Sequence, residues 1–305
     1  MHPDLRRKIT AVGLLVVTFT AGTALVVGTV PGSISAHRIS GIDSCTTISE
    51  PGTYELTDDI ENSGADRCLL VETGDVTLEG NGHLVDGTDR DSAFGVYVDA
   101  DGGGEITVQD LTVRDWEEGV RIVDGETTVE GVEATSNIDG LNARRIADDV
   151  RFENIDAHDN TDDGVEAIHV TGLFVVDSRS TDNDGDGIYL DDADDGEVRN
   201  NVVEGNDEHG VHGFDPDDMS ISDNEIRDNA EDGVHVHAKG ASGARAEDMT
   251  ISSNEITDNG DEGVHLTDLR RVGRITDNTV CNNDDKQFLI EDVPNVEMSG
   301  NDLSC

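Results

Sequence analysis

The feature that most limits what this chain can fold into is a sequence repeat of about 23 residues. Its most regular marker is a glycine, which we call the anchor glycine; it recurs at Gly95, Gly119, Gly140, Gly164, Gly187, Gly210, Gly233 and Gly263. Asparagines keep the same register, nine residues before the anchor at Asn201, Asn224 and Asn254, and four before it at Asn160, Asn183, Asn206, Asn229 and Asn259. A last copy carries Asn278 and Asn283, with Gln287 where a glycine is expected. Such a repeat predicts one small unit per copy, stacked on its neighbours into a solenoid.

Apolar residues follow the same register. They lie twelve residues before the anchor at Phe152, Val175, Val198, Ile221 and Ile251, and one residue after it at Val96, Val120, Leu141, Val165, Ile188, Val211, Val234 and Val264. Segments such as 219–221 and 234–236 alternate between apolar and polar residues, which is typical of strands with one buried face. No stretch after residue 36 has a sustained helical period. We therefore predict an all-β chain whose strands stack about 4.8 Å apart, so that like residues form columns. Asparagine and glycine suit the turns because they tolerate left-handed backbone, and asparagine amides can hydrogen-bond along a column.

This pattern resembles the pectin lyase-like fold of the pectate lyases. The resemblance implies a single-stranded right-handed parallel β-helix of about nine to ten coils, with about 23 residues per coil. Residues 45–87 also resemble the opening of NosD-type and related carbohydrate-acting β-helix proteins, through a Pro-Gly-x-Tyr strand, a second cysteine and the turn Glu79-Gly80-Asn81-Gly82-His83. We expect residues 37–90 to form an N-terminal strand segment and cap, and residues 91–305 to form the repeats. The resemblance implies a surface location but specifies the chemistry poorly, because one fold hosts many activities.

The net charge of −48 excludes some partners. Such a field repels nucleic acid and anionic membranes. The acidic, lysine-poor composition resembles that of proteins from salt-loving archaea, in which molar salt shortens the Debye length to about 3 Å. Most of the acidic residues are therefore interpreted as solvating surface.

The N-terminal segment is typical of export. Arg6-Arg7-Lys8 precedes an uncharged apolar run from Ile9 to Val30, so residues 1–36 are predicted to be a signal peptide or an N-terminal membrane anchor. Either alternative places the bulk of the chain outside the cytoplasm, secreted or anchored at the cell surface, with membrane contact only through this segment.

The four cysteines agree with that location. Three pairings of four cysteines are available, and we favour the local one, Cys45 with Cys68 and Cys281 with Cys305, which would staple both ends of the domain. The cysteines do not show the Cys-x-x-Cys spacing that is typical of metal sites, so metal binding by them is not indicated.

One acidic segment is similar to a calcium loop. Residues 182–187 match the first half of that motif, but the twelfth position is Ala193 where a bidentate acid is required. A helix-loop-helix site is rejected, and a loose Ca²⁺ site formed by Asp184, Asp186 and Asp191 stays as a weak alternative.

The column two residues past the anchor has different chemistry from the rest of the surface. Because strand side chains alternate, it should point outward if the residue after the anchor points inward. The column reads Tyr97, Arg121, Asn142, Glu166, Tyr189, His212, His235 and His265, and two residues further lie Asp191, Phe214 and His237. Imidazoles on successive coils are close enough to share a divalent metal or to pass protons around a substrate. The alternative is a solvent-facing ladder without function.

Residues 212–218 lie in this column and resemble the Tyr-Gly-Phe/Ile-Asp-Pro-His-Asp/Glu motif of mannuronan epimerases. Those enzymes remove the proton next to a uronate carboxylate and replace it from the other side. Asp215, Pro216 and Asp218 match the motif, whereas His212 stands at the tyrosine position and Asp217 at the histidine position. The resemblance gives the candidate catalytic residues His212, Asp215, Asp217, His235, His237 and His265, and the candidate substrate-binding residues Glu166, Tyr189, Asp191 and Phe214. We expect them on one exposed face in a shallow groove, walled by a loop at residues 237–243.

Three functions are compatible with these observations. The first is an exported β-helix protein that binds or processes an extracellular polysaccharide or cell-envelope glycan, with a lyase or epimerase-like activity on uronates. The second is a non-catalytic acidic protein of cell-surface structure or adhesion. The third is a NosD-like protein that handles copper or another metal on the histidines.

Overall fold

The computed structural model describes residues 39–100, 103–146, 149–238 and 248–305. These residues belong to one compact unit, His37–Cys305. The predicted signal or anchor (residues 1–36) lies outside the described residues, as does most of the predicted loop at 237–243. No described segment forms a helix long and apolar enough to cross a membrane.

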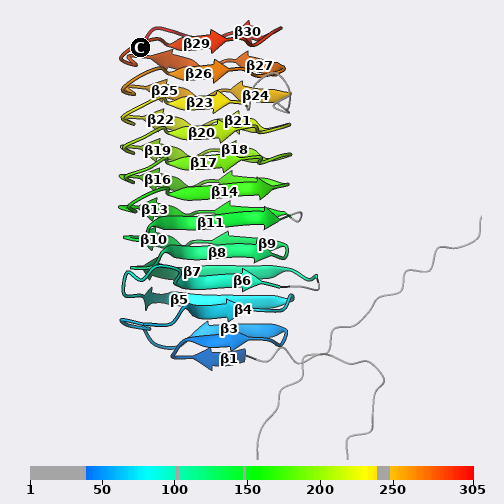
Figure 1. Cartoon of the computed structure of the whole chain (residues 1–305), viewed down its shortest axis with the longest axis vertical. Helices are drawn as coiled ribbons and strands as arrows, with labels where there is room; N and C mark the ends of the chain where they lie inside the picture. Colours follow the sequence, from blue (N-terminus) through cyan, green and yellow to red (C-terminus); the bar gives the residue numbers. More distant parts are fainter. Residues whose placement is uncertain (1–38, 101–102, 147–148, 239–247) are drawn as a thin grey trace, which may run out of the picture. The chain divides into compact units, whose positions relative to one another are not determined.

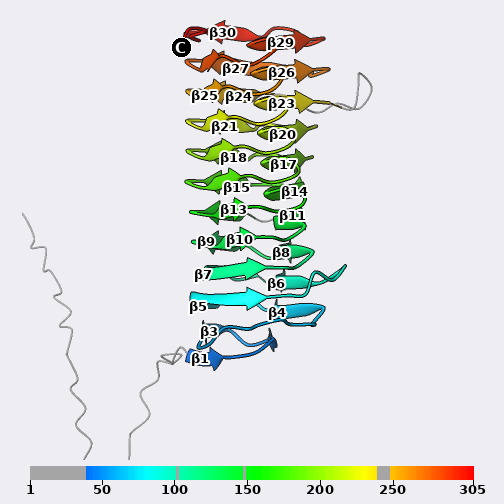
Figure 2. The ribbon, with the colours of Figure 1, turned by 90° about the vertical axis from the view of Figure 1, so that its left-hand side faces the viewer.

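The described residues form a parallel β-solenoid of about ten turns without helices, as predicted (Figures 1 and 2). Each full turn contributes up to three short strands, which pair in parallel with the strands of the turns before and after. One side is an eleven-stranded sheet: β2 (Thr46–Ile48), β4 (Arg67–Val71), β6 (Phe94–Asp99), β8 (Glu118–Asp124), β11 (Asp139–Ile146), β14 (Val165–Val170), β17 (Ile188–Asp191), β20 (Val211–Phe214), β23 (Val234–His237), β26 (Val264–Thr267) and β29 (Phe288–Glu291).

The other strands belong to a nineteen-stranded sheet that covers two sides of the solenoid. One of these sides contains β1 (Ile39–Ile42), β3 (Gly52–Leu56), β5 (Val76–Asp86), β7 (Ile106–Arg114), β9 (Thr127–Glu130), β12 (Val150–Glu153), β15 (Leu173–Val176), β18 (Glu197–Arg199), β21 (Ser220–Ser222), β24 (Met249–Ser252), β27 (Val272–Thr276) and β30 (Glu297–Ser299). The other contains β10 (Glu133–Thr135), β13 (Asp156–His158), β16 (Arg179–Thr181), β19 (Val202–Glu204), β22 (Glu225–Arg227), β25 (Glu255–Thr257) and β28 (Thr279–Cys281). β5 and β7 are long enough to pair on both sides.

The core consists of stacked apolar columns in the predicted register. Ile221 pairs with Val198 on one side and with Ile251 on the other, and all three side chains are buried. The residues that follow the anchor glycines form a second such column, in which Val234 pairs with Val211 on one side and with Val264 on the other. Because each fully buried aliphatic side chain contributes roughly 1.5–3 kcal/mol, these columns supply the main force for stacking the turns.

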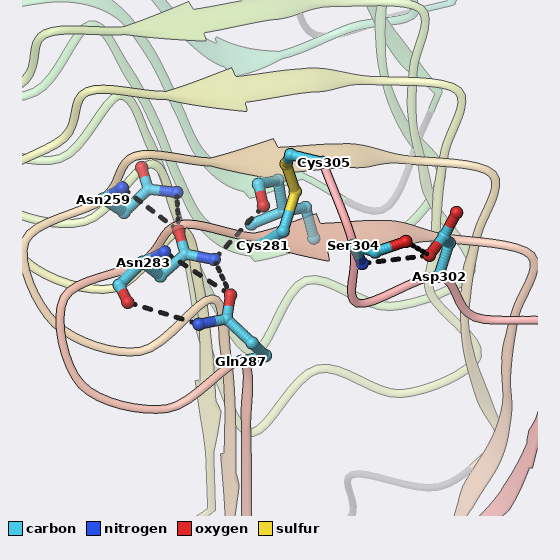
Figure 3. The surroundings of a disulfide bond; sticks show 8 residues. Asn259, Cys281, Asn283, Gln287, Asp302, Ser304 and Cys305 are labelled. Carbon is cyan, nitrogen blue, oxygen red and sulfur yellow. Dashed lines mark hydrogen bonds between the residues drawn. A yellow bond between two sulfur atoms is a disulfide. The ribbon is translucent and has the colours of Figure 1, made fainter.

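The asparagines form two buried ladders along the axis, as predicted. In the longer one, the side-chain amide of Asn183 donates to Oδ1 of Asn206 at 2.9 Å, and Asn206 donates to Asn229 at 2.8 Å. Gln287 takes the last position, where it accepts from Asn283 at 2.8 Å (Figure 3). Each ladder asparagine also donates to a backbone carbonyl of the preceding coil, as Asn206 does to Ser180 at 3.2 Å.

Our explanation for the asparagines and anchor glycines was wrong in one respect. The ladder asparagines do not have a left-handed backbone conformation. The residue before each of them does, and it is most often an aspartate, such as Asp182 (φ 55°) or Asp228 (φ 57°). The anchor glycines are not left-handed either. A Cβ on Gly210 would lie 2.6 Å from the carbonyl oxygen of Gly233 and 2.8 Å from Nδ2 of Asn229. A side chain at an anchor position would therefore clash with the next coil, and glycine is needed because it has none. Much of the aspartate therefore forms turns, in addition to solvating the surface.

Both predicted disulfides are present. Cys45 bonds to Cys68 with their Cα atoms 4.3 Å apart, and Cys281 bonds to Cys305 at 6.0 Å. Figure 3 shows the second one beside the end of the asparagine ladder. Each joins positions one coil apart, near the two ends of the described solenoid.

Candidate functional site

The predicted outward column exists on the eleven-stranded sheet. Register pairs join His212 of β20 to His235 of β23, and His235 to His265 of β26; we call these three residues the histidine column. The rings of His235 and His265 stack with centroids 4.5 Å apart, and those of His212 and His235 stack at 5.2 Å. The side chains are only 17%, 18% and 20% exposed, so the column is partly buried and not the exposed face that we expected.

A second column, which sequence reasoning missed, explains this burial. It consists of the residues immediately before the anchor glycines, which we call the acid column: Glu118, Asp139, Asp163, Asp186, His209, Asp232 and Glu262. Five of its side chains accept the backbone N–H of the next member, at 2.8–3.1 Å for Asp163, Asp186, His209 and Asp232 and at 3.4 Å for Asp139. His209 therefore replaces a carboxylate in a column of acids. Its position before the anchor at Gly210 is the signal that could have found it.

The acid column holds the histidines by hydrogen bonds. Oδ2 of Asp186 lies 2.7 Å from Nδ1 of His212, and Oδ2 of Asp232 lies 3.1 Å from Nδ1 of His265. At His212 the Asp186 carboxylate fixes the N–H on Nδ1 and leaves the Nε2 lone pair available. Nε2 of His212 faces Nε2 of His237 at 3.2 Å, so these two residues form a pair across adjacent strands.

His209 and His235 complete a cluster of five imidazoles with His212, His237 and His265. Nδ1 of His209 accepts the amide N–H of Asp232 at 3.1 Å, so neutral His209 carries its hydrogen on Nε2. That atom lies 3.1 Å from both His235 and Glu231. Five of the ten histidines in the sequence thus gather on three adjacent strands and the turn before β20.

Burial lowers the pKa of three histidines of the cluster. Desolvation lowers the pKa of His209 to about 4 against the opposing charge of Asp186, and desolvation together with His209 lowers the pKa of His235 to about 2. Desolvation together with His212 also lowers the pKa of His237. Desolvation raises the pKa of Asp232 to about 6. At neutral pH, His209, His235 and His237 are therefore neutral, the form that binds metals and accepts protons.

The residues predicted to bind substrate lie around the cluster. Tyr189 contacts His212 edge-on at 5.2 Å, and Phe214 contacts His237 at 4.7 Å between ring centroids. Burial and nearby carboxylates, first that of Asp191, raise the pKa of Tyr189 to about 12, which makes its phenol a poor proton-transfer group. Glu166 lies two coils before His212 and accepts from Arg144 at 2.9 Å.

Unpaired polar atoms mark the same sheet. Among the described residues, four buried side-chain atoms have no hydrogen-bond partner: Oε2 of Glu118, Oδ1 of Asn142, Nε of Arg144 and Oδ1 of Asp191. All four belong to β8, β11 and β17 of the eleven-stranded sheet. Buried polar groups without partners are rare and call for an explanation, and a bound polar ligand is one.

The two motif acids occupy turn positions. Asp215 directly follows β20, is 4% exposed, and has a left-handed backbone (φ 52°) before Pro216. Its backbone N–H donates to the carbonyl oxygen of His237 at 2.9 Å, so Asp215 lies next to the cluster. Asp217 lies further along the turn, where its backbone N–H donates to Asp194 at 3.1 Å. Its catalytic role stays a prediction.

The weak Ca²⁺ alternative stays a prediction, and the geometry does not favour it. Within the described residues, Asp184, Asp186 and Asp191 are not among the groups whose ligand atoms lie within 4.8 Å of one another. The reason is that Asp186 turns into the acid column, where His209 and His212 use its two oxygens. The groups that do converge include His209–His212–His235 and Asp232–His235–His265, which could hold a metal ion.

A family model described as "Right handed beta helix region" matches residues 94–247, just over half of the 305 residues. The chain belongs to this family. The predicted right-handed, pectin lyase-like fold is thereby confirmed. No curated protein is similar to the chain in sequence.

Solved structures share the fold at low identity. A double mutant of the periplasmic alginate epimerase AlgG is 14% identical with a TM-score of 0.67, over 85% of this chain and 70% of that chain. The A-module of the Azotobacter vinelandii mannuronan C-5 epimerase AlgE6 is 14% identical with a TM-score of 0.56, over 89% and 92%. Pectate lyase Pel9A is 16% identical with a TM-score of 0.50, over 83% and 69%. According to their names, these proteins act on polysaccharides. Their similarity to this chain is one of fold.

Proposed function

We propose that this protein binds an extracellular polyuronate on the outward side of the eleven-stranded sheet and removes the proton next to a sugar carboxylate. The observation that carries the proposal is that the His212–His237 pair, held by Asp186, lies on the sheet that also contains all four unpaired buried polar atoms of the described residues. The shared fold with polysaccharide epimerases and a lyase supports the substrate class. The two disulfides support a location outside the cytoplasm.

Each residue has a distinct role in this proposal. His212 is the general base, because Asp186 holds its Nδ1–H and leaves the Nε2 lone pair free to accept a proton. His237, at 3.2 Å, can take the proton onward. Tyr189 and Phe214 pack against the sugar. Asn142 and Arg144, both on β11 three coils before β20, would contact another unit of the same polymer, because each coil advances about 4.8 Å.

The reaction begins when Nε2 of His212 takes the proton on the sugar carbon next to the carboxylate. The electron pair of the broken C–H bond moves into the carboxylate as an enediolate, and His212 becomes an imidazolium. If a proton returns to the carbon from the opposite side, the product is the epimer. If the electron pair instead expels the neighbouring glycosidic oxygen, that oxygen takes a proton from the imidazolium and an unsaturated sugar forms.

Deuterium exchange tests the proton abstraction directly. The full chain is incubated in heavy water and high salt with polymannuronate or polygalacturonate, and NMR measures deuterium at the carbon next to the carboxylate. We expect exchange with one of these polymers and at least about a 100-fold loss in His212→Ala and His237→Ala, the range for removal of a general base. His158→Ala, which removes a histidine from β13 in the other sheet, is the matched control.

Two results would contradict the proposal. One is full exchange in the His212→Ala/His237→Ala double variant. The other is polymer binding without exchange under any of these conditions, which would favour a non-catalytic, adhesive surface protein.

A second candidate is metal handling, as the resemblance to NosD-type proteins implied. The observation that favours it is the convergence of imidazoles and carboxylates into groups that could bind a metal. Metal binding without exchange on any polyuronate would select this candidate.

A further inference from the structure

Three side chains on two strands and one turn present ligand atoms to a common point. Oδ2 of Asp232 lies 3.1 Å from Nδ1 of His265 and 3.3 Å from Nδ1 of His235. The three ligand atoms all lie within 4.8 Å of one another. We call Asp232, His235 and His265 the triad.

These separations fit a tetrahedral metal. If each ligand atom lies about 2.05 Å from a zinc ion, separations of 3.1 and 3.3 Å correspond to ligand–metal–ligand angles of about 98° and 107°. Both values are close to the tetrahedral angle. Two histidines and one carboxylate with a fourth position left open is a ligand set that zinc uses in catalytic sites. Calcium is excluded by the same observation, because it prefers six to eight oxygen ligands.

The surroundings prepare the triad for a cation. Oδ1 of Asp232 accepts the amide N–H of Glu262 at 2.8 Å, which orients the carboxylate and leaves Oδ2 for the metal. His209 carries its hydrogen on Nε2 and has Glu231 within 3.1 Å as an acceptor, so Nδ1 of His235 is not needed as its partner. Both triad histidines are about one fifth exposed, so a metal ion and its fourth ligand can enter from solvent.

We propose that Asp232, His235 and His265 bind one zinc-like divalent transition metal, with an open coordination position that faces solvent. The ion takes the place of the hydrogen between Oδ2 of Asp232 and Nδ1 of His265, so both histidines carry their hydrogen on Nε2 when it is bound. The ion would sit beside the His212–His237 pair, because the His235 ring lies 5.0 Å from that of His237 and 5.2 Å from that of His212. In a protein with a net charge of −48, it supplies the positive charge that the carboxylate of a bound uronate requires. This last role rests on the proposed function; the metal site does not.

Metal binding is measured on the full chain without a histidine tag, in the absence of any sugar. The protein is dialysed against Zn²⁺, and bound metal is determined by elemental analysis. Co²⁺ is then substituted, so that its visible absorption reports tetrahedral coordination. We expect one zinc per chain, at least about 100-fold weaker binding in His265→Ala and Asp232→Asn, and loss of the tetrahedral Co²⁺ spectrum in both. His158→Ala and His212→Ala should keep wild-type affinity, and circular dichroism confirms that each variant is folded.

Three outcomes overturn the site: no stoichiometric zinc in the wild type, unchanged affinity in both triad variants, or loss of zinc in His212→Ala with retention in His265→Ala. The last outcome would move the metal to the His212–His237 pair. Zinc binding by a protein that neither binds nor exchanges any polyuronate would leave the site standing and remove the proposed function. Exchange that does not depend on zinc would leave the proposed function and the metal site standing and remove only the role of the ion in neutralising the uronate carboxylate.

Discussion

The longer asparagine ladder and the histidine column are both stacks of one residue type that recurs once per coil in the sequence, but the two stacks differ in chemistry. In the longer asparagine ladder, almost every member is fully buried, and each amide both donates to and accepts from its neighbours. In the histidine column, the rings also stack at one-coil spacing, but they do not hydrogen-bond to one another along the column. They bond sideways to the acid column and, at His212, to His237.

This difference is the physical reason for assigning the ladder a structural role and for proposing a function for the histidine column. An asparagine placed on successive coils saturates its own hydrogen bonds, so the ladder stabilises the solenoid and leaves nothing for a ligand. A histidine has two ring nitrogens, and one carboxylate can engage only one of them. Repetition of an imidazole with an acid behind it therefore leaves a set of nitrogens that a proton or a metal can use.

The largest expected effect comes from breaking the asparagine ladder in the middle. Asn206→Ala removes the acceptor of the Asn183 amide and the donor to Ser180 in the core, so polar groups of both coils lose partners. We expect the free energy of unfolding to fall by about 3–4 kcal/mol, measured by denaturant titration. Gln109→Ala, which removes a partly buried amide outside the ladder, should cost less than about 1 kcal/mol. Equal losses in the two variants would mean that the ladder is not a special source of stability.

The next effect sharpens the role of the acid column. Asp186→Asn keeps an oxygen for the His209 amide but presents an N–H₂ group to Nδ1 of His212, which moves the hydrogen of His212 to Nε2. We expect deuterium exchange to fall about 100-fold with little loss of stability. Nitrogen NMR of the His212 ring should report the changed tautomer, which a merely structural role for Asp186 would not produce. An unchanged tautomer would show that Asp186 does not position His212.

The sequence predicts the scaffold far better than the site. The anchor glycines set the coil length, so the pairing of Ile221 with Ile251 across the longer step, both asparagine ladders and both disulfides could be placed by counting. The histidine column followed from the same counting. Asp232 escaped because one more acid in a chain with 68 acidic residues carries no signal by type. His209 escaped because it lies before the anchor glycine, outside the column of residues that follow the anchors. The direction of these two side chains depends on the turn before each anchor glycine. The alternation of side chains within strands does not describe that turn.

A smaller effect on the free energy of unfolding is expected at Asp163, a member of the acid column that has no histidine beside it. Desolvation and the charge of Asp186 raise the pKa of Asp163 from 3.8 to about 9, with Asp162 and Asp139 adding to the shift. A raised carboxyl pKa contributes stability that is fully present below pH 3.8 and is lost as the pH rises toward about 9. Asp163→Asn mimics the protonated acid. We expect it to match the wild type near pH 4 and to be more stable by about 2 kcal/mol near pH 9, in denaturant titrations with a chelator present. A constant difference at every pH would show that Asp163 is charged in the fold.

The smallest expected effect is the counterpart of the ladder variant. His212→Ala removes a ring that is 17% exposed, packs edge-on against Tyr189 and lies over Asp186. Unlike Asn206, it leaves no backbone group of the core without a partner, and water can reach the Asp186 oxygen that it uncovers. We therefore expect a loss of about 1 kcal/mol or less in the free energy of unfolding, beside a loss of at least about 100-fold in exchange. His158→Ala in the other sheet is the control for the loss of an imidazole from a strand. A loss of stability as large as that of Asn206→Ala would place the histidine column in the scaffold, because only a stack whose members complete one another's hydrogen bonds should be that costly to interrupt.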